Sequence, residues 1–324
     1  MPGKVVSARE AVELVKDGDM VALHGAGGGN VEPDLLIKAL SDRFTETGSP
    51  ENLTLFHVSG IGDRKTTGLG YLAREGLIRR VIGGHYGMSP LMSKLVHEEK
   101  IEGYNWPQGV MAQWLRDTAA GRPGLITHIG LGTFVDPRLQ GGRMNNRCTE
   151  ELVEVVHLAG KEWLFYRSFP LDVAFIRGST ADEKGNLSLE MEPAWLDVLP
   201  MAMATKNSGG IVIAQVKRLA QAGTLPAKSV KVPGIMVDRV VVHQQQWQTV
   251  LSEYDPSFSG EIKVPIATFA KMSLDERKVI ARRAAMELRP NAIINLGVGM
   301  PDGVAMVAAE ERIEDRMVIT IEQG

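Results

Sequence analysis

A glutamate stands near the end of the chain, directly after an apolar, β-branched run. The run covers residues 318–321, Glu322 follows it, and Gly324 comes two positions later. Such a run is typical of a buried parallel strand. Ligands of open α/β sheets bind beyond the carboxyl ends of the strands. Glu322 is therefore a candidate nucleophile, although a solvated glutamate at a strand end is the simpler interpretation of this segment alone.

A glutamine in an unusual setting is the second candidate. Gln108 lies between Pro107 and Gly109 in the stretch 104–109. The backbone is restricted on both sides, so the side-chain amide could donate to an oxygen that gains negative charge during a reaction. A surface turn explains the same spacing and is favoured by spacing alone.

Two glycine-rich loops follow apolar runs, at 25–30 and at 297–301. Neither completes the G-x-G-x-x-G pattern of dinucleotide sites, because Asn30 and Asp302 stand at the third glycine position. Backbone N–H groups at a helix start suit an anion or a carbonyl oxygen. A tight strand-to-helix turn is the alternative for each loop.

The histidines give no metal-binding pattern. The chain has seven, and none is spaced from another histidine, a cysteine or an acid as metal ligands usually are. We therefore expect no metal site. Most of the histidines are expected to be structural, whereas His85 lies in the glycine-containing turn 83–87 and could line a cleft.

Composition limits the class of protein. At 324 residues the chain exceeds the length at which single cores stop growing, roughly 250–300 residues, so two domains are expected. The net charge of −3, with both signs interspersed, gives no electrostatic reason to expect nucleic acid or membrane partners. The single Cys148 fits a reducing compartment, and no signal or transit segment is recognisable. These features predict a cytoplasmic enzyme.

An ordered set of elements positions the first glycine loop. A capping box at 7–10 begins a helix, a strand follows at 21–23, and the loop 25–30 comes next. Pro33 is expected to open a second helix, and a strand returns at 53–56. The order is helix, strand, glycine loop, helix and strand.

The same order recurs near the C-terminus. A second capping box is expected at 273–276, then a strand at 293–296 and the loop 297–301. A helix at 304–311 and a strand at 317–321 complete the set. The repetition suggests an internal duplication.

Strands followed by turns are expected at 125–129 and 173–176, and buried strands at 210–214 and 235–237. Residues 243–267 have no strong period and are interpreted as a link. Strands alternating with helices predict an α/β architecture.

Taken in order, these motifs resemble those of the family I coenzyme A transferases, most closely the fused acetate/propionate type. The resemblance spans essentially the whole chain. The segments that carry it are 25–30, 82–85, 104–109, 130–138, 177–183, 295–301 and Glu322.

The resemblance implies a fold and a set of roles. Residues 1–265 would form an open α/β CoA-transferase half, and residues 271–324 the beginning of a second, similar half. Glu322 would be the nucleophile and Gln108 an oxyanion donor. The substrate-binding residues implied by the resemblance are Gly27, Gly28, Gly29 and Asn30, and the CoA-binding residues are Asn295, Gly297, Gly299 and Met300.

The implied reaction is a ping-pong transfer of CoA from a short-chain acyl-CoA to a carboxylic acid through a glutamyl-CoA thioester on Glu322. CoA would be a substrate, and no permanently bound cofactor is implied. A homo-oligomer is expected. Because the family's pattern continues beyond the nucleophile, a complementary C-terminal half is expected to be required. The alternatives are an acyl-CoA hydrolase on the same scaffold, a metabolite-binding module without catalysis, and a structural subunit.

Overall fold

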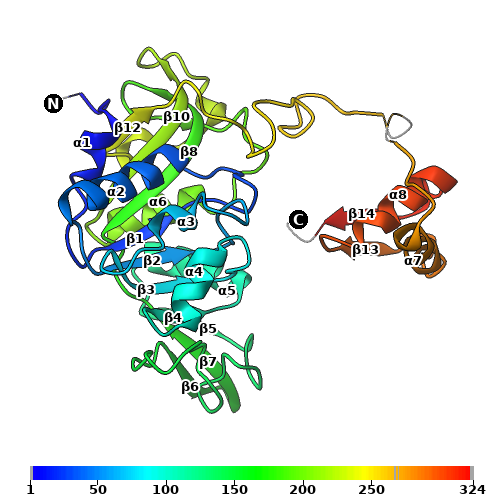
Figure 1. The fold of residues 1–324 in the computed structure, drawn as a ribbon, viewed down its shortest axis with the longest axis horizontal. Coiled ribbons are helices and arrows are strands. Elements are labelled where there is room, and N and C mark those ends of the chain that lie inside the picture. Colours follow the sequence, from blue (N-terminus) through cyan, green and yellow to red (C-terminus); the bar gives the residue numbers. More distant parts are fainter. Residues whose placement is uncertain (1–2, 266–267, 269, 322–324) are drawn as a thin grey trace. The chain divides into compact units, whose positions relative to one another are not determined.

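The computed structural model describes residues 3–265, 268 and 270–321 of the chain (Figure 1). It consists of two compact units, Met1–Gly260 and Glu261–Gly324. The assignment of residues 1–265 and 271–324 as two CoA-transferase halves stays a prediction.

A nine-stranded sheet forms the centre of the first unit (Figure 1). Its strands are β1 (Met20–Leu23), β2 (Leu53–His57), β3 (Ile78–Gly83), β4 (Glu102–Asn105), β8 (Val173–Asp182), β9 (Leu187–Ser188), β10 (Ile211–Ala220), β11 (Val230–Val232) and β12 (Arg239–Val242). The order along the sheet is β11-β9-β8-β1-β2-β3-β4, with β10 also paired to β8 and β12 paired to β10. The strands from β12 through β10, β8, β1, β2 and β3 to β4 are parallel neighbours.

Both faces of this sheet are covered by helices. The helices are α1 (Ala8–Val12), α2 (Asp34–Thr47), α3 (Leu69–Leu72), α4 (Pro90–His97), α5 (Gln108–Ala119) and α6 (Val198–Asn207). Successive strand residues point to opposite faces, so Val21 and Leu23 join the core beneath α1 to α4, whereas Ala22 joins the core beneath α5 and α6. The unit is therefore a three-layer α/β/α structure.

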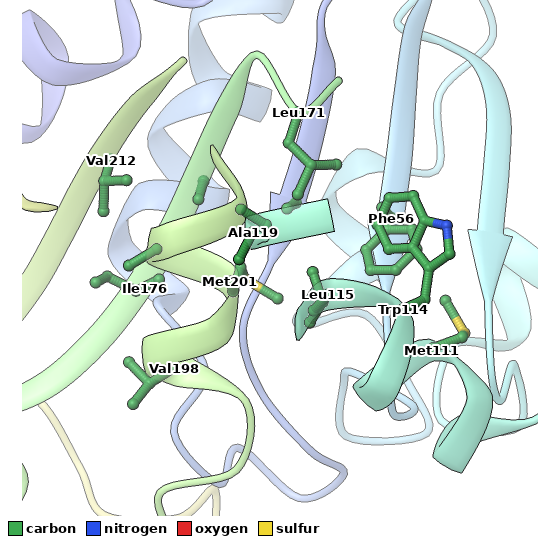
Figure 2. Close-up of a cluster of buried hydrophobic side chains, with 14 of the residues drawn as sticks. Phe56, Met111, Trp114, Leu115, Ala119, Leu171, Ile176, Val198, Met201 and Val212 are labelled. Atoms are coloured by element: carbon green, nitrogen blue, oxygen red, sulfur yellow. The ribbon is translucent and has the colours of Figure 1, made fainter. Parts of the chain in front are cut away.

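Aromatic and aliphatic side chains of α5 and α6 fill the second of these cores (Figure 2). Phe56 of β2 stacks on Trp114 of α5, with ring centroids 4.9 Å apart. Full burial of side chains of this size contributes about 1.5–3 kcal/mol each to the free energy of unfolding. This packing holds the first turn of α5, where Gln108 lies, against the sheet.

A smaller antiparallel sheet contains β5 (Gly124–Thr127), β6 (Val153–Leu158) and β7 (Lys161–Arg167) in the order β5-β7-β6. The stretch 130–138 lies between β5 and β6. There the pKa of the buried Asp136 carboxyl is well below its ordinary value, chiefly because the Arg138 guanidinium donates hydrogen bonds to it. This segment of the expected motif set is an ion-paired turn, which Arg138 also joins to Glu162 of β7 at 2.9 Å.

The α/β prediction is confirmed, and so is the first capping box. Ser7 Oγ accepts from the backbone N–H of Glu10, and the Glu10 carboxylate accepts from the N–H of Ser7. The prediction of a buried strand at 235–237 is wrong. Residues 234–236 form a 3₁₀ turn after Pro233, with Ile235 81% exposed, so no buried strand lies at 235–237.

Residues 243–250 are not a simple link. Gln246 and Gln248 are buried, and the backbone of this stretch packs within the first unit. Buried hydrogen bonds rather than apolar periodicity hold the segment, which explains why the sequence pattern misses it.

The second unit contains α7 (Glu276–Ala285), β13 (Ile293–Leu296), α8 (Asp302–Glu311) and β14 (Val318–Ile321), with β13 and β14 in parallel register. The expected order of elements is confirmed. The second capping box is wrong, because Asp275 rather than Ser273 caps α7, through its contact with the N–H of Lys278.

Burial in the second unit also differs from expectation. Val318 and Ile321 are more than half exposed in the structure, so β14 is a parallel strand but not a buried one. The core of this unit is small and consists of the apolar faces of the two helices, represented by Ala281, Ala285, Val304 and Val307.

Candidate functional site

Several loops converge at one edge of the main sheet. Because β1, β2, β3 and β4 are parallel, the loops that follow them all leave from their carboxyl ends. This is the edge at which open α/β sheets bind ligands. The loop 25–30 follows β1, residues 58–63 follow β2, residues 84–88 follow β3, and α5 begins shortly after β4.

The loop 25–30 has a backbone that only glycine adopts easily at several positions. Gly28 and Gly29 have φ angles of 80° and 79°, in the left-handed region. Gly27 is required for space instead, because a Cβ there would lie 2.7 Å from the Cε of Met88. Gly29 is required for both reasons, its positive φ angle and the lack of space, since a Cβ would lie 2.9 Å from the backbone nitrogen of Val250.

Hydrogen bonds within the protein use half of the backbone N–H groups in this loop, those of Ala26, Gly28 and Gly29. The N–H of Ala26 donates to the carbonyl of Asn30, and the N–H of Gly28 donates to the carbonyl of Gly62. The Asn30 side-chain amide donates to the carbonyl of Gly27. The loop is thus a tight turn whose shape is held by contacts within it and with neighbouring residues.

The start of α2 is occupied too. The N–H groups of Leu35 and Leu36 donate to the side-chain oxygen of Gln215, a fully buried residue of β10, at 3.0 and 3.3 Å. Helix starts attract anions because these N–H groups lack partners. Gln215 supplies the acceptor for Leu35 and Leu36 at the start of α2, so these two N–H groups are not free for an anion.

Glu32 lies directly after the loop and is 2% exposed. Its Oε1 accepts from the N–H of Gly62 at 2.7 Å and from the N–H of Gly29 at 3.3 Å. Burial raises the pKa of Glu32 to about 8, although these two hydrogen bonds and the nearby Arg177 act in the opposite direction. The carboxyl is therefore largely protonated at neutral pH.

Arg177 of β8 is the buried cation beside Glu32. Its guanidinium lies 3.0 Å from the Glu192 carboxylate, and both side chains are almost completely buried. Burial raises the pKa of Glu192, and the charge of Arg177 opposes that rise. The remaining Arg177 hydrogens donate to backbone carbonyls, which belong to Gly29, Glu32, Trp247 and Gln248.

A cavity of about 290 Å³ opens beside these groups. Acidic residues, a buried arginine and apolar residues line it, among them Glu32, Asp34, Asp63, Arg177, Tyr71, Trp247 and Val250. Its volume is at the small end of what ligand sites have. Nothing in the sequence patterns indicated a cavity here.

Gln108 lies at the first position of α5, with Pro107 as the N-cap residue. Its side chain is exposed and lies beside Gly84, where a Cβ would come within 2.6 Å of the Gln108 Cγ. Gly84 in turn donates its N–H to the carbonyl of His57. The structure therefore brings Gln108 to the same sheet edge as the loop 25–30.

The histidines at this edge are structural or peripheral. His57 is fully buried, its Nδ1 lies 2.7 Å from the carbonyl of Ser59, and burial lowers its pKa to about 4. The ring of His85 is exposed and packs against Gly60 and Gly87. Within the described part of the chain, no three His, Cys, Asp or Glu side chains are grouped as a metal site needs.

The other predicted site residues belong to the second unit. Asn295 lies in β13, and its side-chain amide donates to the carbonyl of Ile321 at 3.2 Å. Gly297, Gly299 and Met300 lie in the turn between β13 and α8, and Gly299 has a φ of 106°. Glu322 lies outside the described residues. Asn295 thus contacts the residue that directly precedes the predicted nucleophile.

Sequence reasoning missed Glu32, Glu192 and the glutamines around them. Gln246 illustrates why: its side-chain amide donates to Glu192 and its oxygen accepts from Gln215, across more than thirty positions of sequence. One signal was available, since Arg177 directly follows the apolar run 173–176 and a charge within a buried strand needs a partner.

The raised pKa of Glu32 leads to a testable dependence of stability on pH. The folded-state pKa of about 8 exceeds the ordinary value of 4.5, so the neutral carboxyl stabilises the fold below about pH 4.5 and this contribution is lost as pH rises towards 8. Glu32→Gln cannot titrate. The free energy of unfolding of the wild type relative to Glu32→Gln should therefore fall between about pH 4.5 and 8, by at most about 1.4 kcal/mol per pH unit.

Urea unfolding of both proteins at pH 5, 6.5 and 8 measures this difference. The other titrating groups are present in both proteins and cancel. A difference that stays constant over the range would contradict a raised pKa at Glu32.

Comparisons with known proteins were made for the whole sequence. A family model described as "Coenzyme A transferase" matches residues 5–243. The "Caffeate CoA-transferase" of Acetobacterium woodii is 46% identical over 324 residues, which cover 99% of this chain and 62% of that protein. The "Acetate CoA-transferase YdiF" of Escherichia coli (strain K12) is 43% identical over 321 residues, covering 99% of this chain and 60% of that protein.

A solved structure agrees with these matches. The acyl-CoA transferase YdiF of Escherichia coli O157:H7, described as a thioester complex with CoA, superposes with a TM-score of 0.93 at 43% identity, covering 99% of this chain and 62% of that one. The chain thus spans about 60% of the length of the curated relatives it matches. The expectation of a required complementary half gains no support from the comparisons, which match nearly all of this chain. No helix among the described residues is long and apolar enough to cross a membrane.

Proposed function

Because the chain belongs to the coenzyme A transferase family, we propose that the protein transfers coenzyme A from a short-chain acyl-CoA to a carboxylic acid. The observation that carries this proposal is the 43–46% identity, over 99% of the chain, to relatives named as acetate and caffeate CoA-transferases. Coenzyme A is a substrate in this reaction.

The proposed mechanism uses the carboxylate of Glu322 twice. Its oxygen attacks the thioester carbonyl carbon of the acyl-CoA, the C–S bond breaks, and CoA thiolate leaves, which produces a mixed anhydride. The thiolate then attacks the glutamyl carbonyl, the anhydride C–O bond breaks, and the first acid departs. The acceptor acid repeats these steps in reverse. The free energy of the thioester bond is conserved in the anhydride and in the glutamyl-CoA thioester, so the acceptor acid receives CoA without a further energy source.

Physical chemistry is consistent with a glutamate in this role. The ordinary pKa of a glutamate lies well below 7, so its carboxyl is ionised at neutral pH and needs no general base. Each attack places negative charge on a carbonyl oxygen, and one hydrogen-bond donor aimed at such an oxygen is worth about 3–4 kcal/mol of barrier. Gln108, exposed at the start of α5, is proposed as such a donor.

The glycine segments are proposed to bind the two parts of the acyl-CoA. Residues 27–30 would border the acyl group, since they lie at the sheet edge to which Gln108 also belongs. Asn295, Gly297, Gly299 and Met300 would contact CoA. Asn295 supports this assignment by its contact with the carbonyl of Ile321, next to the proposed nucleophile.

The proposal predicts that acyl exchange depends on an acceptor acid. With acetyl-CoA as donor, adding propionate should produce propionyl-CoA, because the glutamyl-CoA thioester waits for a carboxylate. Caffeate serves as a second acceptor, chosen from the name of one relative. Chromatography of the CoA esters measures both products. Release of free CoA at the same rate without any acceptor would indicate a hydrolase instead, and no reaction of acetyl-CoA would favour a binding module.

Two further expectations stay predictions. A homo-oligomer is tested by light scattering of the purified protein, and a cytoplasmic location by fractionation of the cells that produce it.

A further inference from the structure

The loop 25–30 continues into a strained residue. Val31 is fully buried and has a φ of 49°, which is a true outlier for a β-branched side chain. Backbone strain of this kind persists only where the surroundings enforce it, and it is frequent at functional sites. Something in the structure must therefore hold this part of the loop.

Glu32 holds the loop from one side. Its Oε1 accepts from Gly29 within the loop and from Gly62 in the turn after β2. The N–H of Gly28 reaches the carbonyl of Gly62 as well, at 3.0 Å. Glu32 thereby links the loops that follow two neighbouring parallel strands.

Arg177 holds the same backbone from the other side. Its Nη1 lies 3.1 Å from the carbonyl oxygen of Glu32 and 3.4 Å from that of Gly29. Its Nη2 donates to the carbonyl of Trp247 at 2.5 Å. The flat guanidinium can reach several acceptors in fixed directions, which a lysine ammonium cannot do. Gly29 is thus held at its N–H by Glu32 and at its carbonyl by Arg177.

We propose that Glu32 and Arg177 are positioning residues of the transfer reaction, which hold the loop 25–30 in the shape that receives the acyl group. This inference rests on the proposed function. Neither side chain is required to touch the substrate. Their effect comes through the loop, where small displacements of reacting groups cost large factors in rate.

The test compares variants that keep or remove the acceptor at position 32. Glu32→Gln retains a carbonyl oxygen for the N–H groups of Gly29 and Gly62, whereas Glu32→Leu removes it. For Glu32→Leu we expect kcat/KM for CoA transfer to fall at least tenfold, mainly in kcat, and hydrogen exchange of the amides at 28–31 to quicken at least tenfold. Glu32→Gln should keep most of the wild-type transfer rate, and hydrogen exchange of its loop amides should stay as slow as in the wild type.

Arg177→Lys provides a second variant that retains the charge opposite Glu192. Arg177→Lys should also quicken hydrogen exchange of the loop amides, because a single ammonium nitrogen lacks the planar fork with which the guanidinium reaches the carbonyls of Glu32, Gly29 and Trp247. A matched control is Arg80→Met, which breaks another buried ion pair in the same sheet, with Glu102 at 2.6 Å. The control should lower thermal stability but leave kcat/KM within about twofold and loop exchange unchanged.

The possible outcomes separate the two proposals. Equal loop exchange in Glu32→Leu and wild type would overturn the positioning role, as would equal behaviour of Glu32→Gln and Glu32→Leu. If Glu32→Leu fails to fold, the test rests on Arg177→Lys, and loop amides that exchange as slowly in Arg177→Lys as in the wild type would overturn the positioning role. A wild-type protein without transfer activity would refute the proposed function. The hydrogen-exchange data would still test whether Glu32 and Arg177 fix the backbone of the loop 25–30.

Discussion

Replacing Glu322 with glutamine is expected to lower CoA transfer by on the order of 10⁴- to 10⁶-fold, the loss that follows removal of other catalytic nucleophiles. The amide has nearly the same shape but no anionic oxygen to attack a thioester. The measurement is the rate of propionyl-CoA formation from acetyl-CoA and propionate. In the wild type, hydroxylamine should trap the glutamyl-CoA thioester, and mass spectrometry should place the modification on the peptide that contains Glu322.

A matched control is Glu311→Gln in the same unit. Glu311 lies at the end of α8 and forms an exposed ion pair with Arg282 at 3.2 Å, a kind of contact that contributes little to stability. Its replacement should leave the rate unchanged. Full turnover by Glu322→Gln, or a trapped adduct on a different residue, would remove Glu322 from the mechanism.

Replacing Gln108 with alanine is expected to lower kcat by roughly 10²- to 10³-fold, the cost of one lost oxyanion donor. The reason is the exposed position of its side-chain amide at the first turn of α5. The fold should persist, because α5 is held by Trp114 and its neighbours in the core (Figure 2).

Gln113→Ala offers the control on the same helix, since Gln113 is also exposed on α5. It should retain the wild-type kcat. Circular dichroism of both variants checks that α5 remains folded. If Gln108→Ala keeps its kcat, Gln108 is only the residue that begins the helix.

Local patterns predicted the parts of the fold that depend on local interactions. The capping box at Ser7 requires only residues three positions apart, and β13 was expected at the residues it occupies. The start of α7 was misplaced because Ser273 and Asp275 both suit a cap, and the sequence does not decide between them. The stretch 235–237 looked like a strand because its side chains are apolar, yet Pro233 and Gly234 turn the chain there.

The candidate site depends on contacts that no local pattern contains. Gln108 and the loop 25–30 were singled out from sequence, and the structure places them at one sheet edge. The residues that hold these segments in place were not predicted. The acceptor for the N–H groups at the start of α2 is Gln215, about 180 positions away, and the donor to the loop carbonyls is Arg177, almost 150 positions away. A buried polar residue predicts that a partner exists but does not say which one.

Arg177 joins segments that are distant in the chain, and this constrains which sequence changes the family member can accept together. Its guanidinium serves the loop 25–30, Glu192 and the stretch 246–248 at once. Removing one member of a buried ion pair costs about 3–5 kcal/mol, because the other charge stays buried. A chimera that exchanges residue 177 or residue 192 alone for an uncharged residue of a relative would leave one charge buried without its partner, whereas one that exchanges both together would avoid that cost. Positions 177 and 192, which lie in distant segments of the chain, are therefore expected to change together and not one at a time.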